Sequence, residues 1–516
     1  MLRLIKGLTI FLWGLISVYL LVRLIIVVNN NQLLNLNTSS MSKQKTFVLA
    51  LLGACAALWG CSKTRDTSLK DDNAAAVSKQ QTNALSSAVT NDAIADLAYS
   101  SFDAACFNPN TNLYYSTTNK DGIAAIWTQA IYWDMAMDVY NRTRKPAQLA
   151  RVNAMYQGGF NQYDGYNWNN TTTWFIYDDM MWWIMALARA NQLTGNAAYL
   201  QKAQAGFDRV WAGSYDPVDG GMFWDFNHSG KNSCINFPTV IGAMRLYNIT
   251  HDQTYLTKAQ SIYAWSKTNL TDASTGEVYD NKIGANPPGG QAYTYNAGTA
   301  IGAAYALYKQ SHNATYLADA KRYADYVKNN LCTDGILPAE GDFNEQGVMK
   351  AIFADYMMQL VNEGGQSQYL DWIKQNLTTG WLNRDRARNL TYRNYAVTCP
   401  TGYIQSYEAS SLVTFLQLFP KNVCLFPPGV TFYANTMYGG TSTKPIPKGN
   451  YTLAQLQKYG FVDNWASSAS IPDGWTVTMY SDDNFQGTSW QLNADTPHFP
   501  NLSPTANDVV SSVKIQ

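Results

Sequence analysis

A short pattern recurs along the middle of the chain and limits the folds open to it. Between about residue 90 and residue 420 a polar turn is followed by Tyr-Leu-x-x-Ala, with copies at Tyr199, Tyr255 and Tyr316 and a weaker copy at Tyr369. The intervals between these tyrosines are 56, 61 and 53 residues. Each copy follows one apolar stretch with helical periodicity and opens another. The repeating unit is therefore a helix, a short polar turn, a second helix and a long loop.

Helical hairpins repeated at this spacing must bury their apolar faces against neighbouring hairpins. A unit of about 55 residues fits about six times into this region, and closure into a ring removes the exposed ends. The pattern predicts an all-α (α/α)6 toroid over residues 91–422, with an open helical solenoid as the alternative. In a toroid the inner helices line a cleft and the long loops at one rim carry function. The loops rich in glycine and aromatic residues are 156–177, 213–236, 270–296 and 333–349.

The composition changes after Pro420, where the helical periodicity ends. The motif Tyr-x4-aromatic-x-Gly-Thr-Ser occurs twice, beginning at Tyr433 and at Tyr480, 47 residues apart. Each copy is followed by an acid/amide block that ends in two serines, at 463–468 and 507–512. The glycine of the motif permits a tight fold-over of the hairpin. This duplication predicts a second, all-β domain over residues 426–516.

The first 61 residues are predicted to direct export and to lie outside the fold. Residues 8–28 are apolar and long enough to span a bilayer. A second segment starts at Met41, where two lysines precede an apolar run ending at Cys61, the order of a signal peptide with a lipoprotein box. We expect translation to start at Met41 and Cys61 to carry a lipid anchor; a membrane anchor at 8–28 is the alternative. Residues 62–90 are polar and are predicted to be a flexible tether.

Either interpretation of the N-terminal region predicts an exported chain. We expect an outer-membrane lipoprotein on the periplasmic face or the cell surface. Five cysteines follow Cys61, an odd number whose spacing matches no metal site. We expect mostly buried thiols, with Cys399 and Cys424 as the one pair considered for a disulfide.

The overall charge argues against a nucleic-acid partner. The chain has 37 basic and 37 acidic residues, and phosphate binding needs a basic face. Charged residues make up 14% of the chain and aromatic residues 13%. Low charge with many aromatic rings suits a surface that stacks on sugars, although a large aromatic core would give the same composition.

Two adjacent acids, Asp178 and Asp179, stand between aromatic residues at the start of a predicted helix, in the segment 174–183. Glycosidic cleavage needs two carboxyl groups, one to protonate the leaving oxygen and one to attack the sugar or to activate water. A helix N-terminus favours an anionic side chain, which suits a nucleophile. Apolar neighbours and a nearby like charge raise the pKa of the partner, which suits an acid. The competing interpretation is that the two acids merely cap the helix.

The segment Tyr-Asp-Asp-Met-Met-Trp-Trp at 177–183 resembles the signature of glycoside hydrolase family 76, the endo-α-1,6-mannanases. The likeness continues in Gly-Gly-Met-Phe-Trp at 220–224, in Lys-Asn-Ser-Cys-Ile-Asn at 231–236 and in Tyr-Thr-Tyr-Asn-Ala-Gly at 293–298. The resemblance covers about residues 90–420. It implies an (α/α)6 fold, retention of configuration, Asp178 as the nucleophile and Asp179 as the general acid/base.

The same resemblance implies a set of sugar-contacting residues, each of which could instead be a packing or loop-capping residue. They are Trp127, Tyr177, Trp182, Trp183, Trp224, Asn232, Asn236, Tyr293, Tyr295 and Asn296. The chain departs from the family pattern at Ala297, where glutamine is usual, and at Ala351 and Asp355, where glycine and arginine are expected. These departures lie outside the acid pair and bear on linkage and subsite preference.

The duplicated C-terminal motif resembles a βγ-crystallin domain, two Greek keys in a β-sandwich. Its acid/amide blocks resemble the calcium-binding form of that family, since hard oxygen ligands suit Ca²⁺. The resemblance implies Asn464, Ser467, Asp508 and Ser511 as ligands. The alternative is that these side chains only satisfy loop backbone groups.

The sequence as a whole therefore predicts a retaining, endo-acting glycoside hydrolase that cleaves α-1,6-mannosidic linkages in mannan. We expect no cofactor for catalysis, α-mannan as the polysaccharide partner and a monomer. A non-catalytic glycan-binding lipoprotein and a transglycosylase acting on another α-mannoside are the alternatives.

Overall fold

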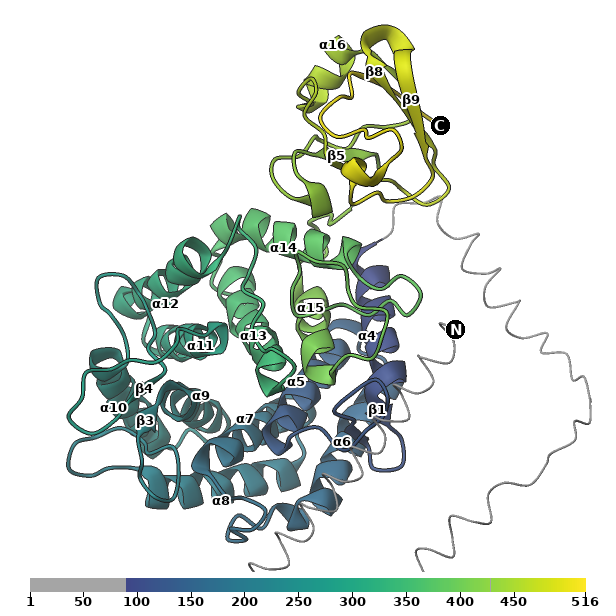
Figure 1. Ribbon diagram of the computed structural model, residues 1–516. Coiled ribbons are helices and arrows are strands. Elements are labelled where there is room, and N and C mark those ends of the chain that lie inside the picture. Colours follow the sequence, from purple (N-terminus) through teal and green to yellow (C-terminus); the bar gives the residue numbers. More distant parts are fainter. Residues whose placement is uncertain (1–89, 427) are drawn as a thin grey trace, which may run out of the picture. The chain divides into compact units, whose positions relative to one another are not determined.

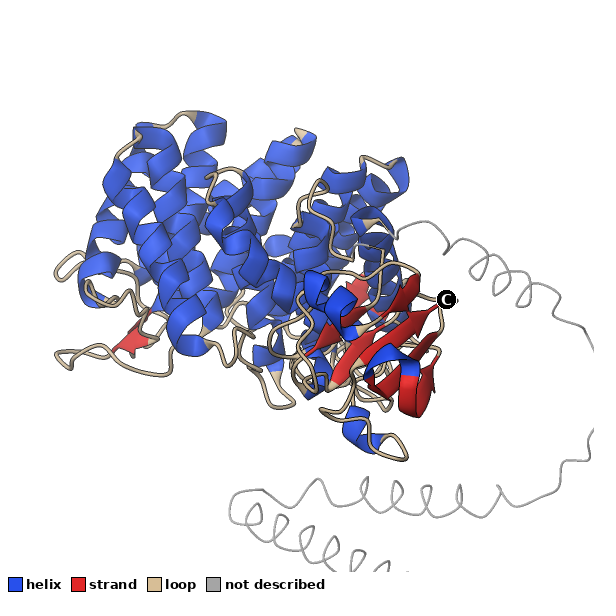
Figure 2. Ribbon diagram, turned by 90° about the horizontal axis from the view of Figure 1, so that it is seen from above, coloured by secondary structure: helices blue, strands red, loops and turns tan. Residues whose placement is uncertain are grey.

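The computed structural model describes residues 90–426 and 428–516. The first described region is rich in helices, and the second contains small β-sheets with short helical turns (Figure 2). The predicted order of a helical domain followed by a β-domain is confirmed. The export segments at 1–61, with Met41 and Cys61, and the tether at 62–89 lie outside the described residues.

Twelve α-helices span the helical domain in the described part of the chain (Figure 1). They are α4 (Asn91–Cys106), α5 (Ile126–Thr143), α6 (Pro146–Gln162), α7 (Tyr177–Thr194), α8 (Ala197–Ser214), α9 (Ser233–Thr250), α10 (Gln253–Asn269), α11 (Thr294–Ser311), α12 (Ala314–Tyr326), α13 (Met349–Asn362), α14 (Leu370–Leu382) and α15 (Ser406–Leu418).

Every second helix belongs to an inner set. Helix α5 packs against α7, α7 against α9, α9 against α11, α11 against α13, α13 against α15, and α15 against α5 again. Helices α6, α8, α10 and α12 each pack against the inner helix that precedes them, and α4 and α14 pack against α15. In Figure 1 the six inner helices surround a common centre. The apolar faces of the hairpins are thus buried against neighbouring hairpins, as the repeat requires.

The inner helices α5, α7 and α15 run in the same direction, because residues near the start of one helix contact residues near the start of its neighbour. Residues near the helix ends contact each other in the same way. The Trp183 indole N–H in α7 donates to the carbonyl of Ile126, the first residue of α5, at 2.8 Å. The Tyr132 hydroxyl in α5 donates to Ser406 at the start of α15 at 3.0 Å. Near the other end, Arg142 of α5 donates to Gln417 of α15 at 3.0 Å. The N-termini of these helices therefore lie at one end of the domain.

The polar turn of the repeat serves as a helix cap. Asn196, Asp252 and Asn313 precede α8, α10 and α12, and each side chain accepts a hydrogen bond from a backbone N–H of the first turn, at 3.0, 2.8 and 3.0 Å. Such caps satisfy donors that the helix itself leaves unpaired. The weaker fourth copy has no such cap: Ser367–Tyr369 form a 3₁₀ turn before α14. The repeat thus marks the tight turn between an inner helix and the next outer helix.

Short strands tie the long loops together. Strand β1 (Phe107–Asn108) pairs with β2 (Leu113–Tyr114), and β3 (Lys231–Asn232) pairs with β4 (Asn281–Lys282), both antiparallel. The second pair joins the loop before α9 to the loop before α11. Two of the loops predicted to carry function are therefore held against each other.

The β-domain contains two sheets in the described residues. Strands β5 (Thr431–Tyr433) and β7 (Ser468–Ser470) form one antiparallel pair. Strands β6 (Gly449–Tyr451), β10 (Ser512–Ile515), β8 (Val477–Asp482) and β9 (Gln486–Leu492) form a four-stranded antiparallel sheet in that order. A one-turn helix, α16 (Leu453–Leu456), follows β6.

The duplicated motif has the same role in both halves of this domain. In the first half, the Ser468 hydroxyl donates to the carbonyl of Asn435 at 2.7 Å and accepts from the N–H of Tyr438 at 3.0 Å. In the second half, the Ser512 hydroxyl donates to the carbonyl of Asp482 at 2.7 Å and accepts from the N–H of Phe485 at 2.9 Å. The last serine of each block thus holds the fold-over turn of its own half.

All five cysteines of the described region are free thiols. Cys399 is buried and Cys424 is exposed. The disulfide considered for this pair is therefore wrong. Among the described residues, no helix is both long and apolar enough to cross a lipid bilayer.

Candidate active site

The acid pair lies in the first turn of α7. Asp178 is half-buried and Asp179 is only 4% exposed. The residue that caps the helix is Ile176, in extended conformation, and no side chain closes this helix start by a hydrogen bond. The interpretation of the two acids as helix caps is therefore wrong. Their position must be explained by what they face at this end of the domain.

Burial dominates the proton affinity of both acids. It raises the pKa of Asp178 to about 7, and hydrogen bonds to the ionised form work against it. One of these donors is the Trp224 indole N–H, 3.2 Å from Asp178 Oδ2. Burial, with the charges of Asp178 and Glu345, raises the pKa of Asp179 well above the usual range. Both pKa values are therefore raised, which favours the protonated form of Asp179, and Asp178 is partly ionised near neutral pH.

A row of aromatic rings adjoins the pair and comes from the starts of three inner helices. The ring of Trp182 in α7 lies 6.0 Å from that of Trp127 in α5 and 6.5 Å from that of Tyr295 in α11. The ring of Tyr293, just before α11, is 6.0 Å from Tyr295. Trp127 and Tyr293 are half-buried, whereas Trp182 and Tyr295 are buried. These four predicted residues are therefore brought together at the acid end of the helices.

Two asparagines and one further acid complete this end. Asn296 is fully buried in the first turn of α11, and its side-chain amide donates to Asp280 Oδ1 at 3.0 Å. Asn232 is half-buried and its backbone pairs with Asn281 in the β3–β4 ladder. Asp280 thus lies where the loops before α9 and α11 meet.

Three predicted sugar contacts are buried within the helical domain. Trp183 has no exposed surface, and its indole N–H donates a hydrogen bond to the carbonyl of Ile126. Tyr177 is 5% exposed, with its ring 4.6 Å from Phe226. Asn236 is fully buried: its amide N–H groups bond the carbonyls of Met222 and Asn232, and its oxygen accepts from the Met222 N–H. The side-chain polar atoms of Trp183 and Asn236 are all hydrogen-bonded within the domain, so these two residues offer no free polar atom to a ligand.

The sequence interpretation missed Asp280, Glu345 and Gln346. Glu345 accepts a hydrogen bond from the Trp127 indole at 2.7 Å, and Gln346 donates to the Tyr293 hydroxyl at 3.2 Å. All three lie in the loops 270–296 and 333–349 that were predicted to carry function. Those loops hold several other acids and amides, and no flanking motif distinguishes these three.

Two of the three departures from the family pattern lie in the first turn of an inner helix, Ala297 in α11 and Ala351 in α13. Ala297 and Ala351 are buried packing residues. Asp355 lies two turns into α13, in contact with Asp138 of α5. None of these residues contacts Asp178 or Asp179 through a side-chain hydrogen bond in the described structure.

The predicted calcium ligands of the β-domain come together as crossed pairs between its halves. Ser467 donates to Asp508 at 3.0 Å, and Ser511 donates to Asp463 at 2.5 Å. Asn464 has a positive φ of 53° and contacts Asp463. Asp463, which was not predicted as a ligand, aligns with Asn507 in the duplicated blocks, whereas Asn464 aligns with Asp508 and shares its positive φ of 53°. The donor set consists of hard oxygen atoms, which fits Ca²⁺ chemically.

Comparison with known proteins settles the family of the helical domain. The model for glycosyl hydrolase family 76 matches residues 88–426. The chain belongs to this family. The match includes all twelve helices of the helical domain and ends before the first strand of the β-domain.

Individual relatives agree with this assignment. The α-1,6-mannanase GH76A from Salegentibacter sp. HEL1_6 is 26% identical, with a TM-score of 0.58, over 64% of this chain and 99% of that chain. A putative mannan endo-1,6-α-mannosidase of Schizosaccharomyces pombe is 26% identical over 275 residues, 48% of this chain and 62% of that protein. The chain covers less than two thirds of the length of either curated relative that it matches.

The C-terminal region has its own relative. A βγ-crystallin domain from Clostridium beijerinckii is 47% identical, with a TM-score of 0.16, over 17% of this chain and 97% of that domain.

Proposed function

We propose that this chain is a retaining, endo-acting glycoside hydrolase that cleaves α-1,6-mannosidic linkages in mannan. The observation that carries the proposal is the acid pair: two adjacent carboxyl groups in one helical turn, neither used as a cap, with different surroundings. Membership of glycosyl hydrolase family 76 supports the class of reaction. The substrate is inferred from the relatives named above, an α-1,6-mannanase and a putative mannan endo-1,6-α-mannosidase.

Asp178 is proposed as the nucleophile. The Trp224 N–H favours its ionised form, and its Oδ1 atom has no hydrogen-bond partner in the described structure. In the first step this carboxylate bonds to the anomeric carbon while Asp179 gives its proton to the departing glycosidic oxygen. A solved structure shows an inactive variant of the Salegentibacter enzyme, in which two consecutive aspartates are replaced by alanine, in complex with α-1,6-mannotetrose. That pairing of two consecutive aspartates with loss of activity supports these roles.

The electrostatic coupling between the acids suits the second step. The charge of Asp178 helps to raise the pKa of Asp179. When Asp178 is esterified by the sugar, that charge is gone and the pKa of Asp179 falls. Asp179, now ionised, can take a proton from the water that releases the sugar from Asp178. The same residue thus serves as acid and then as base.

The aromatic row is the proposed sugar-binding surface. Trp127 and Tyr293 keep part of their rings exposed, and stacking on sugar rings uses such faces. Glu345, Gln346 and Asp280 add hydrogen-bonding groups beside it. The ring of inner helices that supports this surface is proposed to be the (α/α)6 toroid, and the two halves of the β-domain are proposed to be Greek keys of the βγ-crystallin type.

Two further roles extend the proposal. The crossed Ser467–Asp508 and Ser511–Asp463 pairs are proposed to hold Ca²⁺, which would supply charge neutralisation and bridge the two halves of the β-domain. The N-terminal region is proposed to export the chain as a lipoprotein anchored at Cys61.

Release of reducing sugar from linear α-1,6-mannan tests the main proposal. We expect release by the wild type and loss of at least two orders of magnitude in Asp178→Asn and Asp179→Asn, with unfolding temperatures close to that of the wild type. Phe175, exposed on the same loop, offers a matched control in Phe175→Ala, which should keep near-normal turnover. No release by the wild type, with mannan binding retained, would favour a non-catalytic glycan-binding protein and overturn the proposal.

A further inference from the structure

Three carboxyl groups and a single guanidinium meet inside the ring of inner helices, well away from the acid pair. Asp134 and Asp138 lie on consecutive turns of α5, and Arg189 lies in the last turns of α7. Arg189 pairs with Asp134 at 3.3 Å and with Asp138. Asp355 reaches the same place from α13 and contacts Asp138. The cluster thus connects helices that are not all neighbours in the ring.

The charges of this cluster do not balance if every carboxyl group is ionised. Three negative charges would face one positive charge, and Asp134 and Asp138 are 6% and 1% exposed. Asp134 Oδ1 has only the 3.3 Å ion pair with Arg189, and Asp138 Oδ2 and Asp355 Oδ1 have no hydrogen-bond donor in the described structure. Buried polar atoms without partners are rare in folded proteins. The cluster therefore lacks at least one proton donor.

No other charged side chain on the surrounding helices supplies that donor. Arg245 of α9 is bonded to the carbonyl of Met185. The Tyr356 hydroxyl on α13 is directed at the sulfur of Met185. Lys309, the charged side chain of α11, is paired with Glu363. Glu408, the charged side chain of α15, is paired with Arg393.

We propose that one proton is shared between Asp138 and Asp355 and that this carboxyl–carboxylate pair locks α13 to α5 across the ring. A single proton on Asp355 provides the donor that Asp138 Oδ2 lacks and leaves Asp138 ionised for Arg189. Removal of the proton leaves two adjacent negative charges, one on the buried Asp138 and one on the half-buried Asp355. The lock therefore weakens as the pH rises.

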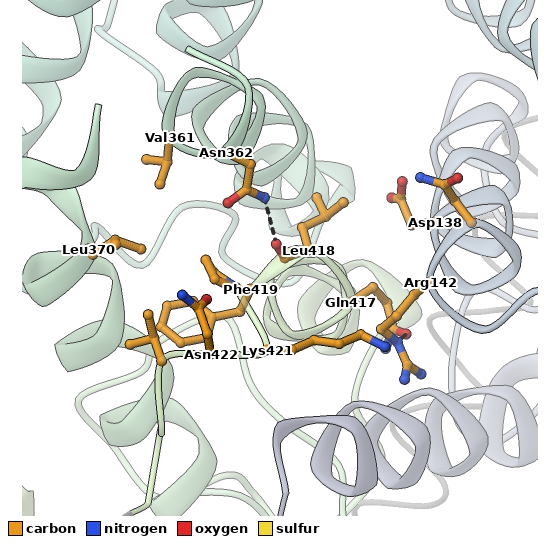
Figure 3. Close-up of a pocket in the computed structure, with 13 residues that line it drawn as sticks. Asp138, Arg142, Val361, Asn362, Leu370, Gln417, Leu418, Phe419, Lys421 and Asn422 are labelled. Atoms are coloured by element: carbon orange, nitrogen blue, oxygen red, sulfur yellow. Dashed lines mark hydrogen bonds between the residues drawn. The ribbon is translucent and has the colours of Figure 1, made fainter. Parts of the chain in front are cut away.

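One member of this pair borders a cavity. Asp138 also lines a cavity of ≈ 530 Å³ at the ends of α5, α13 and α15, together with Arg142, Gln417 and Phe419. Figure 3 shows Asp138 at one side of this cavity and the hydrogen bond from Asn362 to the carbonyl of Leu418 at another. The cavity lies towards the helix ends opposite to the acid pair.

The direction of the pH effect follows from linkage. The pKa of Asp355 is raised well above its usual value by burial and by Asp138. An unfolded chain releases this proton above about pH 4, whereas the folded chain keeps it. The contribution of this group to folding stability is therefore greatest at low pH. Because the folded chain binds one more proton than the unfolded chain, the unfolding equilibrium constant rises about tenfold per pH unit until Asp355 ionises in the folded chain.

Asp355→Asn tests the lock, because its amide N–H can replace the carboxyl proton on Asp138. Chemical denaturation of the full chain is measured between about pH 4 and pH 9. We expect the ratio of the wild-type to the variant unfolding constant to rise about tenfold per pH unit above pH 4, up to the folded pKa. The exposed Asp208→Asn on α8 is the matched control and should show a constant ratio. A ratio for Asp355→Asn that also stays constant would overturn the proposal.

A spectroscopic measurement keeps the proposal falsifiable if the variant folds poorly. In carboxyl carbon NMR of aspartate-labelled protein that carries Asp178→Asn and Asp179→Asn, which removes the signals of the acid pair, one aspartic acid should remain protonated at pH 7 and titrate only at higher pH. A fully ionised Asp355 at pH 7 would contradict it. The acid limb and maximal rate of mannan hydrolysis should be unchanged in Asp355→Asn, so a failure of the proposed enzymatic function is distinguishable from a failure of the lock.

Discussion

Replacing Trp224 by phenylalanine removes the indole N–H that donates to Asp178 and keeps an aromatic ring in the loop. The bond joins Trp224 Nε1 to Asp178 Oδ2 at 3.2 Å, which is long for a charge-assisted hydrogen bond. We therefore take the lower end of the range for bonds to charged groups, about 1.5 kcal/mol. Because this donor favours the ionised carboxylate, its loss raises the pKa of Asp178 by about one unit.

The starting pKa of about 7 makes the consequence measurable. At pH 7 about half of the wild-type Asp178 is ionised, and a rise of one unit lowers this fraction to about one tenth. The value of kcat/KM at pH 7 should fall about fivefold, and most of the loss should be recovered at pH 9. The assay is initial-rate mannan hydrolysis from pH 5 to pH 9.

Trp183→Phe provides the matched control, since it also removes an indole hydrogen bond but one to the carbonyl of Ile126. It should lower the unfolding temperature and leave the acid limb of the pH profile in place. An unchanged acid limb in Trp224→Phe would refute the role of Asp178 as the ionised group of the free enzyme. A shift in both variants would mean that the pH profile reports folding and not this carboxylate.

Three further outcomes are expected. Trp127→Ala should raise KM for mannan about two- to twelvefold with kcat little changed, because the loss of ring stacking costs about 0.5–1.5 kcal/mol of binding free energy. An unchanged KM would show that Trp127 is not part of the sugar-binding surface. Asn236→Ala should lower the free energy of unfolding of the helical domain by about 1–3 kcal/mol in urea denaturation, because the buried Met222 N–H and carbonyl lose their partner. Ser512→Ala should destabilise the β-domain by a similar amount, since the fold-over turn at Phe485 loses its acceptor; equal stability would show that Ser512 does not hold the turn.

The sequence predicted the elements whose signals are local and repeated. The caps Asn196, Asp252 and Asn313 recur at one position of a repeat, so the helical hairpins could be recognised from spacing alone. The β-domain was recognisable for the same reason, because the turn, the glycine and the paired serines occur twice. The acid pair stood out because aromatic residues frame it.

The remaining features depend on contacts between distant segments. Trp182 and Trp183 are adjacent in the sequence, yet α7 turns one towards Trp127 and Tyr295 and the other into the core against Trp133. A motif match cannot separate them, because successive residues on a helix differ by about 100° in direction. Asp280 and Glu345 reach the site only through the packing of loops before α11 and α13. Asp355 becomes notable only when α5 and α13 are brought together.

Covalent trapping tests the central claim most directly. A slow, fluorinated α-mannosyl substrate is incubated with the wild type, and the modified peptide is identified by mass spectrometry. The roles proposed for the pair predict a glycosyl ester on Asp178, accumulation of the same ester in Asp179→Ala when the leaving group is activated, and products that first appear with the α configuration. A label on Asp179, or first products of the β configuration with no labelled carboxyl group, would contradict it.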